Sequence, residues 1–354
     1  MAVYLITGAS GYIGSMLTDH LLKNEPDCEV IAPVRDIQKA GKRFADIWGH
    51  ARPGRISEKE DGSEGKEKRG LSRLHLAESD LCSGRLFGNF CNVVSHIDYV
   101  IHCASVTSSR EMVLHPTEVI QSIVNATQNI LELARRCGAK SIVCLSSMEV
   151  YGGLECTDGH RAAEREAGAG RVDILSARSC YPMGKRMAEN ICYSYFKEYG
   201  VPVKIARLAQ TFGRGVPPSD NRVFAQFARA VRSGEDIVLH TEGGSMGNYC
   251  GIDDVISGIL TILKQGADGE AYNVVNEENT MTIRQMAQLV ASQVAGGRIG
   301  IRMETLPVER SMYAADTGLR MSGEKLRNLG WKPKQNLAGM YREMLEDMEK
   351  RGGS

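Results

Sequence analysis

The 354-residue sequence lacks several features that mark other classes of protein. Its 43 basic and 43 acidic residues leave no net charge, so nothing favours nucleic acid or a membrane surface as a partner. It has no apolar run of about 18 residues, and its N-terminal run, AVYLIT, is too short for a signal peptide. The ten cysteines form no C-x-x-C pair, and no histidines lie at metal-ligand spacing. We therefore expect a reduced, cytoplasmic protein without a metal site.

What the sequence contains is an alternation of short apolar runs and longer segments with helical periodicity. VYLIT precedes SMLTDHLLK, and HIDYVIHCA precedes PTEVIQSIVNATQNILELARRC. Such alternation predicts β-α-β units, and hence an α/β fold of Rossmann type, with a doubly wound parallel sheet covered by helices. We expect a dinucleotide-binding domain over residues 1–180. Residues 181–354 are expected to combine the remaining sheet elements with a smaller, interleaved substrate-binding lobe.

One stretch, residues 50–73, is poor in hydrophobic residues and rich in charge. We interpret this stretch as a mobile surface insertion between early elements of the sheet. A phosphate-binding role for Lys66, Lys68 and Arg69 is the alternative interpretation.

The segment ITGASGYIG places Gly8, Gly11 and Gly14 between the first expected strand and the first expected helix. Glycines at this point allow a tight turn and let backbone N–H groups approach a pyrophosphate at the positive end of a helix. The position directly after a strand and before an amphipathic helix supports a dinucleotide site over a merely structural turn.

The end of the second strand, VIAPVRD, bears on which dinucleotide is bound. An acid at this point commonly binds the ribose hydroxyls of NAD, whereas an arginine accommodates the 2′-phosphate of NADP. Val34 occupies the expected slot of the acid, and Arg35 follows. We therefore expect the cofactor to be NAD or NADP, and Arg35 slightly favours NADP. Asp36 keeps the NAD alternative open.

Tyr181 and Lys185 are four positions apart, a spacing that places two side chains on one face of a helix. A second such pair, Tyr193 and Lys197, follows 12 residues later. At about 3.6 residues per turn, this second pair is rotated by roughly 120° from the first, so both cannot face one site. Pro182 is tolerated in the first turn of a helix, which places Tyr181 at the helix start.

In their order along the chain, TGASGYIG, DL, HCAS, SSMEVYG and YPMGK resemble the extended short-chain dehydrogenase/reductase family. This family consists mainly of nucleotide-sugar epimerases, dehydratases and decarboxylases. RSCYPMGKRMAEN is most similar to the matching segment of UDP-glucuronate decarboxylases. The resemblance covers almost the whole chain and implies NAD(P)-dependent enzymatic activity.

The resemblance implies roles for individual residues. Tyr181 would be the general acid/base, Lys185 would hold the nicotinamide ribose and acidify the tyrosine, and Ser147 would bridge to the substrate hydroxyl. Glu149 would be an additional acid/base. A serine at a strand end is otherwise an ordinary cap or turn residue. The expected cofactor contacts are Gly8, Ser10, Gly11, Tyr12, Ile13, Gly14, Arg35, Asp80, Leu81, Ala104, Ser105, Tyr181 and Lys185.

Several positions depart from the family pattern. Ile123 stands where the superfamily places an asparagine that organises a proton-relay water. Gln210 replaces the usual asparagine, and Met148 stands where dehydratases place an aspartate. Gly247 and Gly251 occupy the usual slots of a phosphate-binding arginine and a following tyrosine.

The missing arginine bears on how the substrate is bound. A charge-assisted phosphate contact is worth roughly 1.5–3 kcal/mol, so another cation must compensate for it. Arg222 is the candidate, and an ordinary surface arginine is the alternative. The expected substrate-binding residues are Ser147, Gln210 and Arg222.

We thus expect an enzyme, of epimerase, decarboxylase or dehydratase type, that modifies a nucleotide-linked sugar. It would oxidise a sugar hydroxyl transiently to a ketone, and it would form a homodimer. Two alternatives remain at this point. One is an NADPH-dependent reductase of a small carbonyl compound, and the other is a dinucleotide-binding sensor or interaction protein without catalysis.

Overall fold

The computed structural model describes residues 1–48, 54–55, 73–83, 96–153, 165–168, 170–304 and 318–352. The predicted insertion therefore lies mostly outside the described residues, as do Lys66, Lys68 and Arg69. The chain forms two compact units, and each is built from three segments. The first unit comprises Met1–Val150, Val172–Arg207 and Ile259–Tyr272. The second comprises Tyr151–Arg171, Leu208–Gly258 and Asn273–Ser354.

A parallel sheet forms the centre of the first unit. Within the described residues its strand order is β12-β7-β6-β5-β1-β2-β4-β3, and the paired strands β1 to β6 run parallel. The strands are β1 (Ala2–Thr7), β2 (Cys28–Val34), β3 (Gly54–Arg55), β4 (Leu74–Glu78), β5 (Tyr99–His102), β6 (Ser141–Ser147), β7 (Val203–Leu208) and β12 (Ala271–Val274). The chain builds outward from β1 in one direction and then from β5 in the other. The predicted Rossmann-type fold is confirmed.

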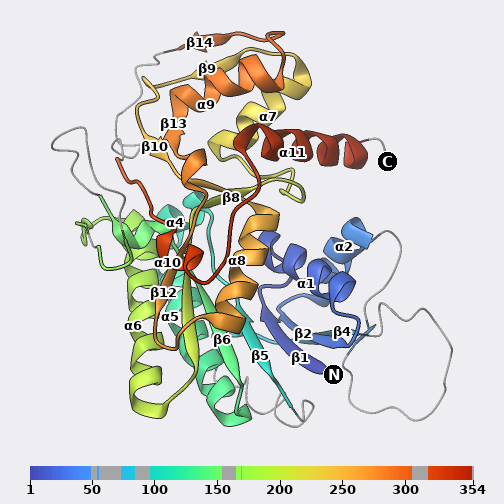
Figure 1. Ribbon diagram of the computed structural model, residues 1–354, viewed down its shortest axis with the longest axis vertical. Coiled ribbons are helices and arrows are strands. Elements are labelled where there is room, and N and C mark those ends of the chain that lie inside the picture. The colour runs from blue at the N-terminus through green and yellow to red at the C-terminus, as the bar shows by residue number, and fades with distance from the viewer. Residues whose placement is uncertain are drawn as a thin grey trace. The chain divides into compact units, whose positions relative to one another are not determined.

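Helices connect these strands, as the apolar periodicity predicts. Their bounds are α1 (Tyr12–Asn24), α2 (Ile37–Trp48), α4 (Ser109–Leu114), α5 (Pro116–Cys137), α6 (Cys180–Tyr199) and α8 (Ile252–Gln265). The helices α5 and α6 lie side by side (Figure 1). Between them, the side chain of Ile123 lies against Gly184. Buried apolar residues of β1, β5, β6, β7, α5 and α6 share one core.

The second unit contains short strand pairs and helices. Its elements are β8 (Gln210–Phe212), α7 (Val223–Ser233), β9 (Ile237–Leu239), β10 (Met246–Gly247), β11 (Tyr249–Gly251), β13 (Met281–Thr282), α9 (Ile283–Leu289), the π-helix Val290–Val294, β14 (Ile301–Met303), α10 (Glu324–Arg327) and α11 (Leu337–Gly352). The strand β8 pairs with β11 in parallel. Phe212 lies at the centre of an aromatic core, stacked on Phe224 at 4.6 Å between ring centroids and packed edge-on against Tyr341.

Candidate active site

The turn between β1 and α1 requires glycine at two positions. Gly8 has a φ of +65°, and a Cβ atom there would lie 2.8 Å from the backbone of Ala104. A Cβ atom on Gly14 would lie 2.3 Å from the carbonyl oxygen of Gly8. The turn therefore packs against both the end of β5 and the first turn of α1. The start of α1 presents N–H groups that have no helical acceptor, which suits an anionic ligand.

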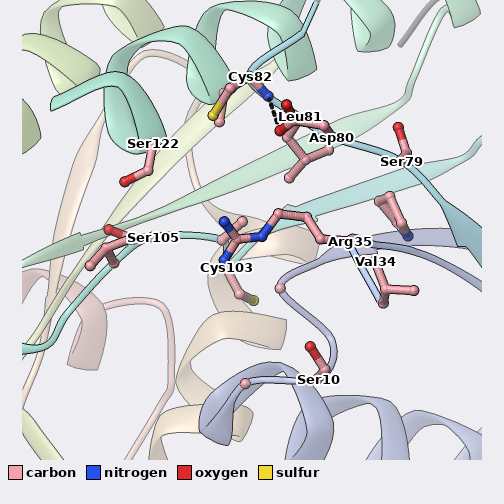
Figure 2. Close-up of a pocket in the computed structure, with 16 residues that line it drawn as sticks. Ser10, Val34, Arg35, Ser79, Asp80, Leu81, Cys82, Cys103, Ser105 and Ser122 are labelled. Atoms are coloured by element: carbon pink, nitrogen blue, oxygen red, sulfur yellow. Dashed lines mark hydrogen bonds between the residues drawn. The ribbon is translucent and has the colours of Figure 1, made fainter. Parts of the chain in front are cut away.

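A pocket of about 240 Å³ opens beside this turn, at the carboxyl ends of the strands (Figure 2). It lies where the strand order reverses between β1 and β5, the usual position of ligands in such sheets. Most of the predicted cofactor contacts line it: Gly8, Ser10, Gly11, Arg35, Asp80, Leu81, Ala104 and Ser105. Tyr12, Ile13 and Gly14 belong to the first turn of α1 and are not among the lining residues.

The pocket also contains residues that the sequence motifs did not single out. Pro33, Ser79, Cys82, Cys103 and Val106 flank predicted positions at the same strand ends, so proximity to those motifs was an available signal. Ser122 and Ala126 come from α5, and no local pattern could have identified them. The hydroxyl oxygen of Ser105 is buried and has no hydrogen-bond partner among the described residues. The glycine turn and this unsatisfied hydroxyl fit a bound dinucleotide.

A buried polar chain supports the floor of this pocket. Thr7 accepts a hydrogen bond from the backbone N–H of Ala104, and its hydroxyl lies 2.7 Å from Nδ1 of His102. Nε2 of His102 lies 3.3 Å from the hydroxyl of Thr127. Burial, together with the charge of Lys185, lowers the pKa of His102 to about 3, so the imidazole is neutral. The chain thereby ties the ends of β1 and β5 to α5.

Tyr181 and Lys185 project from the first two turns of α6, and each side chain is 6% exposed. The Lys185 ammonium lies 5.8 Å from the centre of the Tyr181 ring and donates a hydrogen bond of 2.8 Å to the carbonyl oxygen of Leu145. Burial lowers the pKa of Lys185 to about 8. Tyr193, in contrast, is 46% exposed on another face of the helix, as predicted.

Ser147 ends β6, the strand that also carries the Leu145 carbonyl, and it is half-buried. Its hydroxyl accepts a hydrogen bond of 3.2 Å from the backbone N–H of Glu149. Glu149 itself forms an ion pair with Arg178, with N···O distances of 2.9 and 3.0 Å. Arg178 lies in the short helix before α6, so this pair joins the segment after β6 to the start of α6.

A second charged pair, absent from the sequence-based predictions, anchors the same region. Glu189 of α6 accepts a hydrogen bond of 2.5 Å from the Ser146 hydroxyl and a bidentate pair of bonds from Arg207 of β7. Both charged side chains are nearly buried, with exposed fractions of 13% and 12%. The network fixes the residue next to Ser147.

The described residues were also searched for membrane-spanning helices and for metal-binding clusters. No described helix is long and apolar enough to cross a membrane. No group of three potential metal-ligating side chains was found among the residues that could be searched.

Comparison with known proteins identifies the family. Residues 4–275 match the profile of the NAD dependent epimerase/dehydratase family, which is more than half of the chain. The chain belongs to this family.

Relatives with assigned names are nucleotide-sugar enzymes. UDP-glucuronic acid decarboxylase 5 of Arabidopsis thaliana is 28% identical over 99% of this chain and 90% of its own length. UDP-glucuronic acid decarboxylase 1 of Danio rerio is also 28% identical, over 82% of this chain, but this match spans only 60% of the zebrafish protein.

Solved structures share the fold. The UDP-glucuronic acid 4-epimerase of Bacillus cereus, in complex with UDP-glucuronic acid and NAD, superposes with a TM-score of 0.75 at 18% identity, covering 98% of this chain and 99% of the epimerase. The UDP-glucose 4-epimerase of Thermotoga maritima gives a TM-score of 0.76 at 20% identity over the same shares of the two chains.

Ile123, which stands where an asparagine was expected, packs in the interior of the first unit. Ile123 is fully buried, and its Cδ1 would lie 3.1 Å from a Cβ placed on Gly184. An apolar side chain thus fills the space between α5 and α6 at this position.

In the second unit, Gly247 and Gly251, which stand where an arginine and a tyrosine were expected, are each covered by another side chain. A Cβ on Gly247 would lie 2.3 Å from the hydroxyl oxygen of Tyr249, and one on Gly251 would lie 1.9 Å from Oε1 of Gln335. Gln210 lies in β8, where its backbone N–H bonds to the Asn248 carbonyl.

Arg222 is already paired in the structure. Its guanidinium forms an ion pair of 2.5 Å with Asp220 and lies 4.6 Å from the centre of the Phe224 ring. A phosphate-binding role for Arg222 stays a prediction, and it would require the guanidinium to exchange Asp220 for the phosphate.

Proposed function

We propose that this family member is an NAD(P)-dependent enzyme that modifies a nucleotide-linked sugar through transient oxidation of a sugar hydroxyl. The observation that carries the proposal is the buried Lys185 ammonium beside Tyr181, in the same unit as the glycine turn and its pocket. The family match and the printed activities of the relatives support the substrate class.

In this proposal, each group of the site has a defined task. Tyr181 takes the proton of the sugar hydroxyl, and the field of the Lys185 cation stabilises the phenolate that accepts it. Ser147 orients that hydroxyl from the end of β6. A dinucleotide held by the pocket residues would supply the reversible hydride acceptor for the carbon that bears the hydroxyl. The pocket residues bind and orient this dinucleotide.

The ketone formed in this way permits several outcomes at neighbouring carbons. If the carbon next to the ketone carries a carboxylate, the C–C bond to CO₂ can break, because the ketone takes up the electron pair as an enolate that is then protonated. Glu149, held by Arg178, is the group that would assist proton transfer at this stage. The resemblance of RSCYPMGKRMAEN to decarboxylases and the named relatives favour a uronic acid substrate.

The test is direct. Purified protein is incubated with UDP-glucuronic acid, with UDP-glucose as the matched substrate that lacks the carboxylate, each with added NAD or NADP. We expect mass spectrometry to detect a UDP-pentose, or chromatography coupled to it to separate a 4-epimer of equal mass, from the uronic acid. Conversion of neither sugar nucleotide would contradict the proposal.

A reductase that uses NADPH is the second candidate. Arg35 lines the pocket and has no partner among the described residues, so its guanidinium is available for the 2′-phosphate of that cofactor. Net consumption of reduced cofactor with a small carbonyl compound, and no turnover of sugar nucleotides, would favour it. Dinucleotide binding without either activity would favour the non-catalytic sensor.

We also propose that the protein is a cytoplasmic homodimer. Ile120 of α5 and Met183 and Met187 of α6 are exposed to 44%, 39% and 51%, on two helices that lie side by side. Light scattering is expected to give twice the chain mass, and Met187→Glu is expected to shift the protein towards the monomer. A monomeric wild type would contradict the assignment.

A further inference from the structure

The ion pair between Arg178 and Glu149 occupies only part of the arginine side chain. The two oxygens of the Glu149 carboxylate lie 2.9 and 3.0 Å from the same nitrogen, Nη2 of Arg178. Among the described residues, neither Nη1 nor Nε of this guanidinium has a hydrogen-bond partner. The side chain of Arg178 is 39% exposed. The donors of Nη1 and Nε therefore remain available for a further anion.

This arginine lies beside the proposed catalytic groups. It belongs to the short helix Ala177–Ser179, and Tyr181 follows about one helical turn later, at the start of α6. On the other side of the ion pair, the backbone N–H of Glu149 donates to the hydroxyl of Ser147. The pair thus flanks the place where Ser147 and Tyr181 are proposed to hold the sugar hydroxyl.

Two other cations of α6 bond to the main chain. Lys185 donates to the carbonyl oxygen of Leu145, and Arg186 donates through Nε to the carbonyl oxygen of Val150. Arg178 differs from them, because it meets a single carboxylate and keeps unused donors.

A carboxylate on the sugar matches these unused donors. Arginine binds carboxylates through charge-assisted hydrogen bonds, which are roughly twice as strong as neutral ones. Without a cation, a second carboxylate at this place would be repelled by Glu149. With Arg178 between the two carboxylates, Nη2 keeps its bonds to Glu149 while Nη1 donates to the substrate.

We propose that Arg178 recognises the carboxylate of a nucleotide-linked uronic acid and so selects this substrate over neutral sugars. The inference rests on the proposed function, because it takes the site to hold a nucleotide-linked sugar. The contact with the substrate contributes to binding, whereas the positioning of Glu149 affects turnover at saturating substrate. Binding measurements therefore isolate the proposed role of Arg178.

Two ligands that differ only at carbon 6 of the sugar serve as probes. UDP-glucuronic acid carries a carboxylate at this carbon, and UDP-glucose carries a neutral hydroxymethyl group. Both are titrated calorimetrically into the full-length Tyr181→Phe protein with saturating NAD or NADP, because loss of the proposed proton acceptor keeps the ligands intact.

Three further substitutions are made in this background. Arg178→Gln removes the charge, and Glu149→Gln removes the carboxylate of the ion pair but leaves the guanidinium. Arg136→Gln is the matched control, at an exposed arginine in the last turn of α5. Circular dichroism verifies that each variant folds.

We expect the Tyr181→Phe protein and its Arg136→Gln variant to bind UDP-glucuronic acid about 10-fold more tightly than UDP-glucose, as one charge-assisted contact provides. Arg178→Gln should abolish this preference and leave the affinity for UDP-glucose within about 2-fold. Glu149→Gln should keep the preference, because the guanidinium is still present.

Several results would overturn the assignment of Arg178. Equal affinities for the two sugar nucleotides before any change at Arg178 would do so, as would an equal loss of both in Arg178→Gln. Loss of the preference in Glu149→Gln would show that Arg178 acts only through Glu149. Binding of UDP-glucose alone refutes only the carboxylate contact, and binding of neither sugar nucleotide refutes the proposed function as well.

Discussion

The ammonium of Lys185 lies 5.8 Å from the centre of the Tyr181 ring while it donates to the carbonyl oxygen of Leu145. The cation is thus held by the strand that ends in Ser147 and is directed at the side chain proposed to transfer the proton. This geometry joins α6 to β6 and connects Tyr181, Lys185 and Ser147, three of the four proposed catalytic groups of the first unit.

Replacing Tyr181 with phenylalanine is expected to lower turnover by roughly 10²- to 10⁴-fold, because general acid/base catalysis is lost. The phenyl ring keeps the buried packing, so dinucleotide affinity should change little. Turnover of the sugar nucleotide and calorimetric binding provide the two measurements. Tyr193→Phe, at an exposed position on another face of α6, should leave both unchanged. Full activity in Tyr181→Phe would exclude Tyr181 as the proton acceptor.

The burial of Lys185 makes the stability of the protein depend on pH. Its pKa falls from 10.5 in the unfolded chain to about 8 in the folded protein, so the unfolded state binds more protons between these values. As the pH falls from 10.5 to about 8, the wild type should lose stability relative to Lys185→Met, by on the order of 3 kcal/mol in total. Urea unfolding of both proteins across this range measures the difference. A constant difference would show that Lys185 titrates normally.

The Glu149–Arg178 ion pair can be tested with a double-mutant cycle. Glu149→Gln should reduce turnover without weakening dinucleotide binding, because Glu149 is not part of the pocket lining. If Arg178 acts by positioning Glu149, then Arg178→Ala should add little further loss in the Glu149→Gln background. Independent, multiplicative losses would mean that Arg178 acts on its own. Arg136→Ala, which removes an exposed ion-pair partner of Glu132, is the control and should keep activity within about 2-fold.

The crowding around Gly247 predicts a loss of stability when a side chain is added there. Gly247→Ala should destabilise the protein by about 1–3 kcal/mol, because the new Cβ would meet the buried ring of Tyr249. Gly41→Ala is the matched control. It lies inside α2 with no atom within 4 Å of the new Cβ, and it should stabilise the helix by about 0.5–1 kcal/mol. Chemical unfolding midpoints distinguish the two effects. An unchanged free energy of unfolding in Gly247→Ala would mean that the Tyr249 ring moves aside easily.

The sequence by itself determined the features that depend on neighbouring residues. The alternation of apolar runs predicted the β-α-β order, and the glycines of ITGASGYIG identified the turn between β1 and α1. The spacing of Tyr181 and Lys185, with Pro182 between them, placed both on one face at the start of α6. These are properties of one turn or one helix, so the local pattern was sufficient.

Only the tertiary structure decided which distant groups meet. Lys185 bonds to a carbonyl 40 positions earlier, and Glu189 pairs with Arg207 and Ser146 across two strands. Gly247 has no space for a side chain because the Tyr249 ring covers it. The partners in such contacts are set by packing among segments far apart in the chain, and no local pattern records them.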